Sequence, residues 1–279
     1  MISQIKRVKA LLAARNRRAR KGLGQHFLVD RSYLRYIASA AELGTGDVVI
    51  EVGPGLGVLT EELVKAAGRV IAVEIDETLA DSLPKSSNLT VVKSDILATS
   101  PGELLGADAP SYKVVANLPY NIASQVIRRF LESENKPSIM VVMVQREVAR
   151  NMVAAPPQMN LLAVGVQLYG SPKIVRKVPP SAFYPRPRVD SAIVRIDVYD
   201  KPAVDVDDVN TFFRVVKAGF STKRKQLHNS LSLGLNVPVT RAMKLLAEAN
   251  IGHKRRAQTI SLSEWANVAY IYGDQYDNG

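Results

Sequence analysis

Between residues 47 and 144, short apolar runs alternate with segments of helical spacing, and no other feature constrains the possible folds of this chain as strongly. The apolar runs are rich in valine and isoleucine, as buried strands are, and comprise Val48–Glu51, Val70–Glu74, Leu89–Lys93, Lys113–Asn117 and Ile139–Val144. Residues 58–67, 77–83 and 122–133, which lie between these runs, have the spacing of helices. The alternation predicts a doubly wound α/β sheet.

The remainder of the chain changes character near residue 201. Two further strand-like runs, near residues 161–169 and 189–198, are expected to form an antiparallel addition at the edge of the sheet. Beyond Asp200–Pro202 no strand pattern remains, and the sequence predicts four short helices at residues 207–219, 222–233, 240–249 and 261–271. We therefore expect an α/β domain over residues 1–200 and a small all-helical domain over residues 201–279.

Positive charge gathers toward both ends of the chain, whose formal net charge is +11. Residues 1–29 contain eight lysines and arginines and no acidic residue. Such an excess suits a polyanion or an anionic membrane surface, and its clustering favours a nucleic acid over merely solvated helix faces. The predicted RNA-contacting residues are Arg17, Arg18, Arg20, Lys21, Arg186, Arg188, Lys223, Arg224 and Lys225.

Several other classes of protein are disfavoured by composition. The chain has no cysteine, so disulfides and thiolate zinc sites are excluded, and its three histidines lack ligand spacing, so we expect no metal. No apolar run is long enough to span a membrane. The amphipathic, arginine-rich N-terminal segment leaves an organelle transit peptide open, although serines are nearly absent there. We expect a cytoplasmic protein, and a monomer because nothing suggests an obligate oligomer.

A glycine-rich segment, Glu51–Gly57, directly follows the first predicted strand. Glycines at the carboxyl end of a strand let the backbone approach a ligand closely. A dinucleotide-binding loop would read G-x-G-x-x-G, but here Gly57 comes one residue early and Val58 takes the third glycine position. This spacing favours S-adenosylmethionine over NAD, although a simple strand-to-helix turn remains an alternative for the motif alone.

Acidic residues end the next two predicted strands. Glu74 follows the glycines by about twenty residues, where a carboxylate can accept hydrogen bonds from both ribose hydroxyls of a nucleoside. Asp95 ends the third strand and is expected near the adenine ring of the cofactor. The neighbouring Ile75 and Ile96 are included in the predicted cofactor site.

The segment Asn117–Tyr120 follows the fourth predicted strand and indicates the reaction. The lone pair of an aromatic amine is delocalised, so two acceptors that grip its N–H groups would free the lone pair for attack. The Asn117 side-chain oxygen and the Leu118 carbonyl are the expected acceptors. Pro119 biases Leu118 toward an extended conformation, and Tyr120 offers a face on which a base can stack. Taken alone, the segment would also fit a strand-end turn.

These motifs resemble the ribosomal RNA adenine dimethyltransferases of the KsgA type. The resemblance runs from Lys21 to about Tyr270 and rests on the segments Gly24–Leu28, Glu51–Gly57, Asn117–Ile122, Phe183–Ala192 and Phe220–Leu231. It implies a Rossmann-like S-adenosylmethionine-dependent methyltransferase that dimethylates the N6 amines of two adjacent adenosines near the 3′ end of small-subunit rRNA. The implied substrate is rRNA within a pre-ribosomal particle.

The resemblance also implies a set of site residues. The expected cofactor-binding residues are His26, Leu28, Glu51, Gly53, Gly55, Glu74, Ile75, Asp95, Ile96 and Asn117. His26 stands where many relatives have asparagine, and both side chains can form hydrogen bonds. The expected catalytic residues are Asn117, Leu118, Pro119, Tyr120 and Phe183. Phe183 lies in a proline-rich loop that can present its ring to the target base opposite Tyr120, although a buried anchor residue is the alternative.

Two other functions stay open at this point. A related enzyme could modify one adenine of large-subunit rRNA and confer antibiotic resistance, but it would fit the C-terminal helical half less well. A non-catalytic nucleic-acid-binding protein could keep the fold, but intact Gly53, Glu74 and Asn117 argue against lost cofactor binding.

Overall fold

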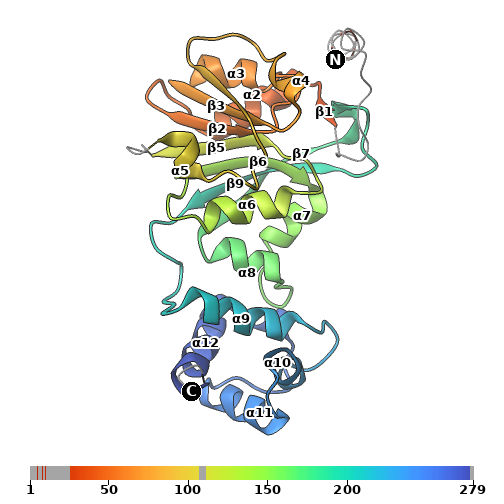
Figure 1. The fold of residues 1–279 in the computed structure, drawn as a ribbon. Coiled ribbons are helices and arrows are strands. Elements are labelled where there is room, and N and C mark those ends of the chain that lie inside the picture. Colours follow the sequence, from red (N-terminus) through yellow and green to blue (C-terminus); the bar gives the residue numbers. More distant parts are fainter. Residues whose placement is uncertain (1–4, 6–7, 9, 11–25, 107–110, 277–279) are drawn as a thin grey trace. The chain divides into compact units, whose positions relative to one another are not determined.

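The computed structural model describes residues 5, 8, 10, 26–106 and 111–276. The chain divides into two compact units (Figure 1). The first comprises residues 1–150 and 171–198, and the second comprises residues 151–170 and 199–279. No helix in the described ranges is long and apolar enough to cross a lipid bilayer.

A seven-stranded sheet organises the first unit. Its strands are β2 (Val48–Val52), β3 (Arg69–Glu74), β4 (Leu89–Lys93), β5 (Tyr112–Asn117), β6 (Ile139–Gln145), β7 (Gly170–Val178) and β9 (Ser191–Val198). They lie in the order β4-β3-β2-β5-β6-β9-β7. The five strands from β4 to β6 run parallel, and β9 pairs with β6 in the antiparallel direction. The strand order reverses between β2 and β5, which is where open α/β sheets bind their ligands.

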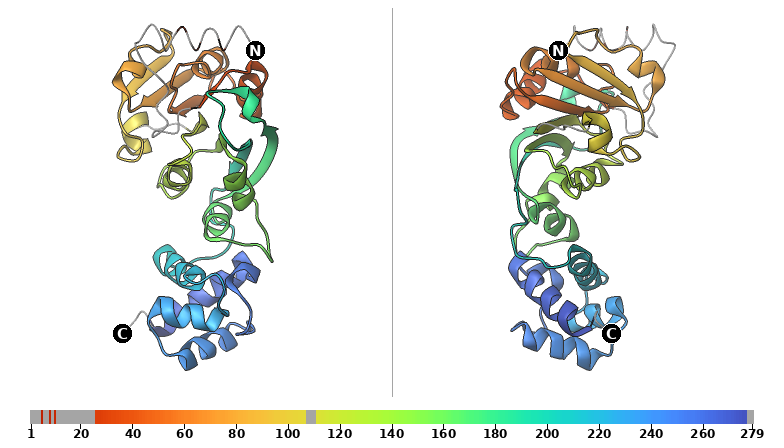
Figure 2. Two further views of the ribbon diagram at one scale, coloured as in Figure 1. Left: turned by 90° about the vertical axis from the view of Figure 1, so that its right-hand side faces the viewer. Right: turned by 60° about the vertical axis from the view of Figure 1, so that its left-hand side comes forward.

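Helices cover both faces of this sheet. The helices of the first unit are α2 (Arg31–Ala40), α3 (Thr60–Ala66), α4 (Glu77–Ala80), α5 (Pro101–Leu105), α6 (Ala123–Leu131) and α7 (Arg146–Met152). In both views of Figure 2, α2 (red) and α6 (yellow-green) lie on opposite sides of the strands. Leu34 and Ile37 of α2 share one core cluster with Val49 and Val141 of the sheet. Burial on both faces explains why β2 is apolar at nearly every position.

A second, two-stranded sheet joins distant parts of the chain. The strands β1 (Phe27–Leu28) and β8 (Phe183–Tyr184) pair in the antiparallel direction, with Leu28 opposite Phe183. The short 3-10 helix η2 (Pro180–Ala182) leads into β8. This pairing fixes the segment that begins at His26 against the first unit.

The second unit is helical. Its helices are α8 (Leu161–Gln167), α9 (Val209–Phe220), α10 (Leu227–Leu235), α11 (Val239–Glu248), the 3-10 helix η3 (Ala257–Thr259) and α12 (Leu262–Tyr276). Trp265 of α12 is fully buried and contacts Phe220 with ring centroids 5.6 Å apart. A Cβ on Gly219 would lie 2.2 Å from the Trp265 ring, so only glycine permits α9 and α12 to pack this closely.

Most of the predicted elements are confirmed. The five parallel strands, the strand near residues 189–198 and the four C-terminal helices are all present. The predicted strand at residues 161–169 is wrong, because residues 161–167 form α8. The side chain of Asn160 accepts a hydrogen bond from the Ala163 N–H and starts that helix. The apolar residues of this segment show no periodicity, so the sequence pattern does not distinguish a buried helix from a buried strand.

Two other features differ from the sequence prediction or extend it. The edge strand β7 was missed, because its charged and half-exposed residues interrupt the apolar pattern. The predicted division near residue 201 assigned residues 151–170 to the α/β domain, whereas this segment belongs to the helical unit in the structure.

Candidate active site

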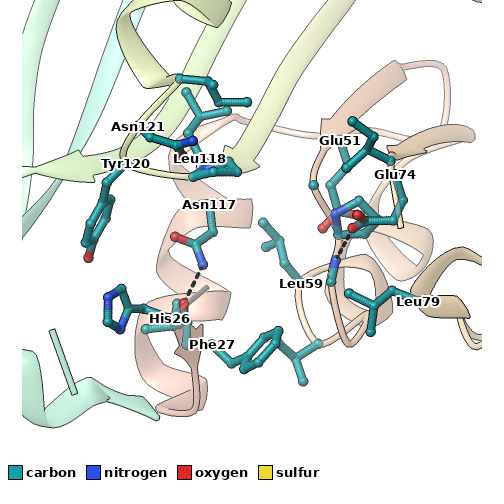
Figure 3. Close-up of a pocket in the computed structure, with 18 of the residues that line it drawn as sticks. His26, Phe27, Glu51, Leu59, Glu74, Leu79, Asn117, Leu118, Tyr120 and Asn121 are labelled. Carbon is teal, nitrogen blue, oxygen red and sulfur yellow. Dashed lines mark hydrogen bonds between the residues drawn. The ribbon is translucent and has the colours of Figure 1, made fainter. Parts of the chain in front are cut away.

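A crevice of about 240 Å³ lies at the carboxyl ends of the central parallel strands (Figure 3). Two carboxyl side chains, Glu51 and Glu74, lie on one side of it, and Asn117 and Tyr120 lie on the other. The strands β2, β3 and β5 carry Glu51, Glu74 and Asn117 to the reversal point of the sheet. We call these two sides the cofactor side and the base side.

The glycine loop after β2 forms part of the crevice wall. Gly53, Gly55 and Gly57 have φ values of 65°, 58° and 75°, in the left-handed region that side chains disfavour. A Cβ on Gly55 would lie 3.1 Å from the Phe27 ring. A Cβ on Gly57 would lie 2.8 Å from Pro84. The loop therefore needs glycine for both its conformation and its close packing.

Glu74 is held by the backbone at the end of β3. Its two carboxylate oxygens accept hydrogen bonds from the Gly55 N–H and the Asp76 N–H, both at 3.0 Å. The side chain is only 6% exposed. Burial raises the pKa of Glu74, and the two N–H groups act in the opposite direction by favouring the charged form. A carboxylate fixed in this way has lone pairs left to accept ribose hydroxyls.

Glu51 lies deeper in the same wall. Its side chain is 1% exposed and accepts a hydrogen bond from the Thr60 hydroxyl at 2.6 Å. Burial, with a further contribution from the nearby Glu74 carboxyl, raises the pKa of Glu51 to about 8, and the hydrogen bond from Thr60 acts in the opposite direction. In the described part of the chain, neither Glu51 nor Glu74 forms a salt bridge.

The amide of Asn117 has a defined orientation. Its Nδ2 donates a hydrogen bond to the backbone carbonyl of His26 at 3.3 Å, shown as a dashed line in Figure 3. The side-chain oxygen therefore remains available as an acceptor at the crevice. The sequence predicts Asn117 as the acceptor but not the carbonyl that orients it, because His26 lies 91 positions away in the chain.

The backbone after Asn117 is fixed from the neighbouring strand. The Leu118 N–H donates to the carbonyl of Met143 on β6 at 3.2 Å. Within the described residues, the Leu118 carbonyl accepts no backbone hydrogen bond. Both Leu118 and Pro119 line the crevice. This leaves a second acceptor next to the Asn117 amide.

Tyr120 and His26 form an aromatic pair on the base side. Their ring centroids are 5.5 Å apart with an interplanar angle of 28°. The His26 Nδ1–H donates to the carbonyl of Pro185 at 2.8 Å, and the Tyr120 hydroxyl bonds to the Ser191 hydroxyl at 2.6 Å. Three segments far apart in the sequence thus hold one aromatic surface.

The remaining predicted cofactor residues take up different positions. Ile75 is 62% exposed at the crevice, and its side chain can cover a flat ring. Asp95 also lines the crevice, and its carboxylate accepts the Leu97 N–H at 2.9 Å. Leu28 lines it as well, whereas Ile96 is a buried residue outside the lining. Phe27 and Leu79 are lining residues that the sequence did not indicate as cofactor contacts.

Phe183 is not brought to the crevice with the other predicted catalytic residues. Its ring is 1% exposed and belongs to the core cluster that contains Leu28, Leu34 and Ile37. In this structure Phe183 therefore has the position of a buried anchor residue, which was the alternative interpretation of its motif. A role as a stacking surface for the base stays a prediction and requires the ring to leave this cluster.

The predicted RNA-contacting residues fall in separate places. Arg17, Arg18, Arg20 and Lys21 lie outside the described residues. Arg186 and Arg188 are exposed in the loop after β8. In the second unit, Lys223, Arg224 and Lys225 are exposed directly before α10. The Leu227 N–H donates to the Arg255 carbonyl at 2.7 Å, which brings the exposed Lys254 and Arg256 to the same end of α10.

The fold and the crevice define a Rossmann-like methyltransferase, and comparisons with known proteins identify its family. A family model for the ribosomal RNA adenine dimethylase matches residues 16–268. The ribosomal RNA small subunit methyltransferase A of Dehalococcoides mccartyi strain 195 is 49% identical over 97% of this chain and 94% of that protein. The protein of the same name from Moorella thermoacetica is 41% identical, with 94% and 96% of the two chains covered.

Two solved structures are similar over most of the chain. The 23S rRNA methyltransferase ErmE is 28% identical, with a TM-score of 0.68 and coverage of 88% of this chain and 98% of that one. A dimethyladenosine transferase from Plasmodium falciparum has a TM-score of 0.75, with 24% identity and 89% and 98% coverage. The chain belongs to the ribosomal RNA adenine dimethylase family.

Proposed function

We propose that this chain is a small-subunit rRNA adenine dimethyltransferase that acts on the N6 amines of two adjacent adenosines near the 3′ end of that RNA. The observation that carries the proposal is the fixed Asn117 amide, whose oxygen is available at the crevice beside the Leu118 carbonyl. The small-subunit assignment is supported by the 49% identity to a relative named for that activity.

The cofactor side suits S-adenosylmethionine, which supplies an electrophilic methyl group on a sulfonium centre. The glycine loop leaves room for the cofactor, since a Cβ at Gly55 would crowd the ring of Phe27. Glu74 is positioned to accept the ribose hydroxyls, and the exposed Ile75 can pack against the adenine ring. Asp95 provides an acceptor for the exocyclic amine of that ring.

The base side prepares the amine of the target adenosine. The Asn117 oxygen and the Leu118 carbonyl each accept one N–H, which orients the nitrogen and favours a pyramidal geometry. The lone pair then points along one direction instead of spreading into the ring. The main catalytic gain is correct positioning of the two reactants, and the proton can leave the nitrogen after transfer.

Tyr120 presents the stacking surface for the base. Contact with His26 and the hydrogen bond to Ser191 hold its ring in place before substrate arrives. An enzyme that modifies a base must take it out of the nucleic-acid stack, and a rigid aromatic ring compensates for part of that lost stacking. Phe183 is proposed to complete the base site from the opposite side after its ring moves.

Exposed basic residues bind the RNA backbone. We assign this role to Arg186 and Arg188 next to the crevice and to Lys223, Arg224 and Lys225 in the helical unit. RNA helices are recognised largely through shape and phosphates, so two basic surfaces suit a large folded RNA. The substrate is therefore a partly assembled small-subunit particle, and the enzyme acts on it as a cytoplasmic monomer.

A methyl-transfer assay tests the proposal. Purified protein is incubated with labelled S-adenosylmethionine and small ribosomal subunits from cells that lack this methyltransferase. We expect label in small-subunit rRNA as N6,N6-dimethyladenine, and far slower labelling with the Asn117→Ala variant. A label confined to protein, or absence of label with a folded and cofactor-loaded enzyme, would contradict the proposal.

The second candidate is methylation of large-subunit rRNA. The similarity to the 23S rRNA methyltransferase ErmE is the observation that favours it. The identity to ErmE is 28%, compared with 49% to the small-subunit relative, so we place it second. The same assay with large ribosomal subunits, or with naked 23S rRNA, separates the two functions.

A further inference from the structure

We propose that Glu51 distinguishes the cationic methyl donor from its neutral product, because it binds the donor as a carboxylate and the product as a neutral acid. This inference rests on the proposed function. It concerns the cofactor side alone and predicts that donor binding releases a proton into solution.

The two carboxyls of the cofactor side are held in different ways. Glu74 accepts two backbone N–H groups, which can only donate and therefore favour its charged form. Within the described part of the chain, the hydrogen bond of the Glu51 carboxyl is to the Thr60 hydroxyl, which can donate to a carboxylate or accept from a carboxylic acid. The contacts of Glu51 therefore permit both protonation states, whereas those of Glu74 favour one.

Burial and charge favour the neutral form of Glu51 in the empty crevice. The side chain is 1% exposed, and the other titratable lining residues of the crevice are Glu74, Asp95, His26 and Tyr120. Glu74 is the one that acts electrostatically on Glu51, and it raises its pKa. With a pKa of about 8, Glu51 is mostly protonated at pH 7.

The cofactor changes that balance through its charge. S-adenosylmethionine carries a net positive charge at neutral pH, whereas S-adenosylhomocysteine has lost the sulfonium charge and is neutral overall. The sulfur is bonded to the 5′ carbon of the ribose, so a ribose held at Glu74 keeps the sulfur in the crevice that Glu51 lines. A cation within about 4–6 Å lowers the pKa of a carboxyl by about 1–3 units.

The consequence is preferential binding of the donor. Donor binding ionises Glu51 and gains a charge–charge attraction in a site with little solvent. The product offers no such attraction, so Glu51 keeps its proton when the product is bound. The preference weakens as pH falls, because releasing a proton is less favourable at a higher proton concentration.

Isothermal titration calorimetry of the full-length protein tests the inference. Binding of S-adenosylmethionine and of S-adenosylhomocysteine is measured at pH 7 in phosphate and in Tris, whose ionisation enthalpies differ. We expect the donor to release roughly one proton more than the product. The sulfonium charge makes the donor's amino group more acidic than the product's, so each free ligand is titrated separately and its own proton change is subtracted.

Variants assign the proton to its residue. Glu51→Gln keeps the size and can still bond to Thr60, so we expect it to abolish the extra proton and reduce the donor-to-product affinity ratio about tenfold or more. Glu74→Gln is the matched control, and it should weaken both ligands similarly. Most of the extra proton should remain, because burial and not Glu74 is the main cause of the raised pKa of Glu51. If Glu51→Gln does not fold, Thr60→Val replaces it and should move the pH midpoint of donor binding upward.

The outcomes separate this inference from the proposed function. Donor binding without extra proton release, or an unchanged extra proton in Glu51→Gln, would overturn the inference and leave the proposed function intact. A folded protein that binds neither ligand would overturn both. Donor affinity that rises up to about tenfold per pH unit between pH 6 and 8, and then levels off, would support the inference.

Discussion

The two sides of the crevice are built in different ways. On the cofactor side, the hydrogen bonds of Glu51 and Glu74 span 9 and 19 positions at most. On the base side, the bonds that hold Asn117, Tyr120 and His26 span 91, 71 and 159 positions. The cofactor side is thus formed by one strand–loop–helix segment and the adjacent strand β3. The base side forms only when distant segments of the chain pack together.

This difference separates binding from chemistry. Changes on the cofactor side should alter cofactor affinity and local stability, because its groups act on the bound nucleoside. Changes on the base side should alter the rate of methyl transfer, because its groups orient the amine and the base. Each of the following predictions either sharpens that division or breaks it.

The largest effect is expected from Asn117→Ala. Loss of one positioned acceptor should reduce the turnover rate about 10²–10³-fold, by analogy with removal of a single group that binds a transition state. RNA affinity should change little, since the RNA is held mainly through phosphates. Single-turnover kinetics and filter binding measure the two quantities separately. A parallel loss of RNA affinity would make Asn117 a docking residue.

Glu51→Gln should change how stability depends on pH. The folded-state pKa of Glu51 is raised to about 8, so its contribution is fully present below the unfolded pKa near 4.5 and is lost as pH rises through about 8. The wild type should therefore lose about 2 kcal/mol of unfolding free energy relative to the variant between pH 6 and pH 8. Urea denaturation of the cofactor-free proteins gives this difference. Parallel stability curves would show that Glu51 is already ionised.

Glu74→Ala should weaken cofactor binding about 10–100-fold. The variant loses hydrogen bonds to a charged acceptor, each worth roughly 1.5–3 kcal/mol. Calorimetric titration measures the affinity, and circular dichroism checks that the fold is retained. Unchanged affinity would remove the ribose assignment, and an unchanged affinity with a lower turnover rate would break the division between the two sides.

Tyr120→Phe should have the smallest effect. The ring stays in place against His26, and only the hydrogen bond to Ser191 is lost, worth about 1 kcal/mol. We expect a several-fold lower rate at unchanged cofactor affinity. Ser191→Ala removes the same bond from the other side, so the double variant should be no worse than either single one. Additive losses would mean that the hydroxyl acts on the substrate directly.

The division between the two sides also explains what the sequence could predict. Glu51 and Glu74 lie near the carboxyl ends of buried strands and Gly55 follows one, at characteristic spacings, so local pattern is enough to locate them. The sequence does not predict that His26 orients Asn117 and joins Tyr120 to Pro185, because these contacts depend on the pairing of β1 with β8. Phe183 shows the same limit, since its motif suggests an exposed aromatic loop but its partner strand buries the ring.

The prediction of a strand at residues 161–169 was wrong for a related reason, since residues 161–167 form the helix α8. Its apolar residues are buried on nearly every side, so the run carries no period of two or 3.6. The helices α9 and α11 were predictable because each has one apolar and one polar face. The buried strands β2 and β3 were predictable for another reason, because valine and isoleucine dominate their apolar runs.

The most direct test of the account is to map modified adenosines in rRNA from cells with and without this protein. We predict N6,N6-dimethyladenine at two adjacent positions near the 3′ end of small-subunit rRNA when the protein is present, and unmodified adenosines there when it is absent. Mass spectrometry of nuclease fragments distinguishes one methyl group from two. A product with a single methyl group, or methylation that lies only in large-subunit rRNA, would contradict the account.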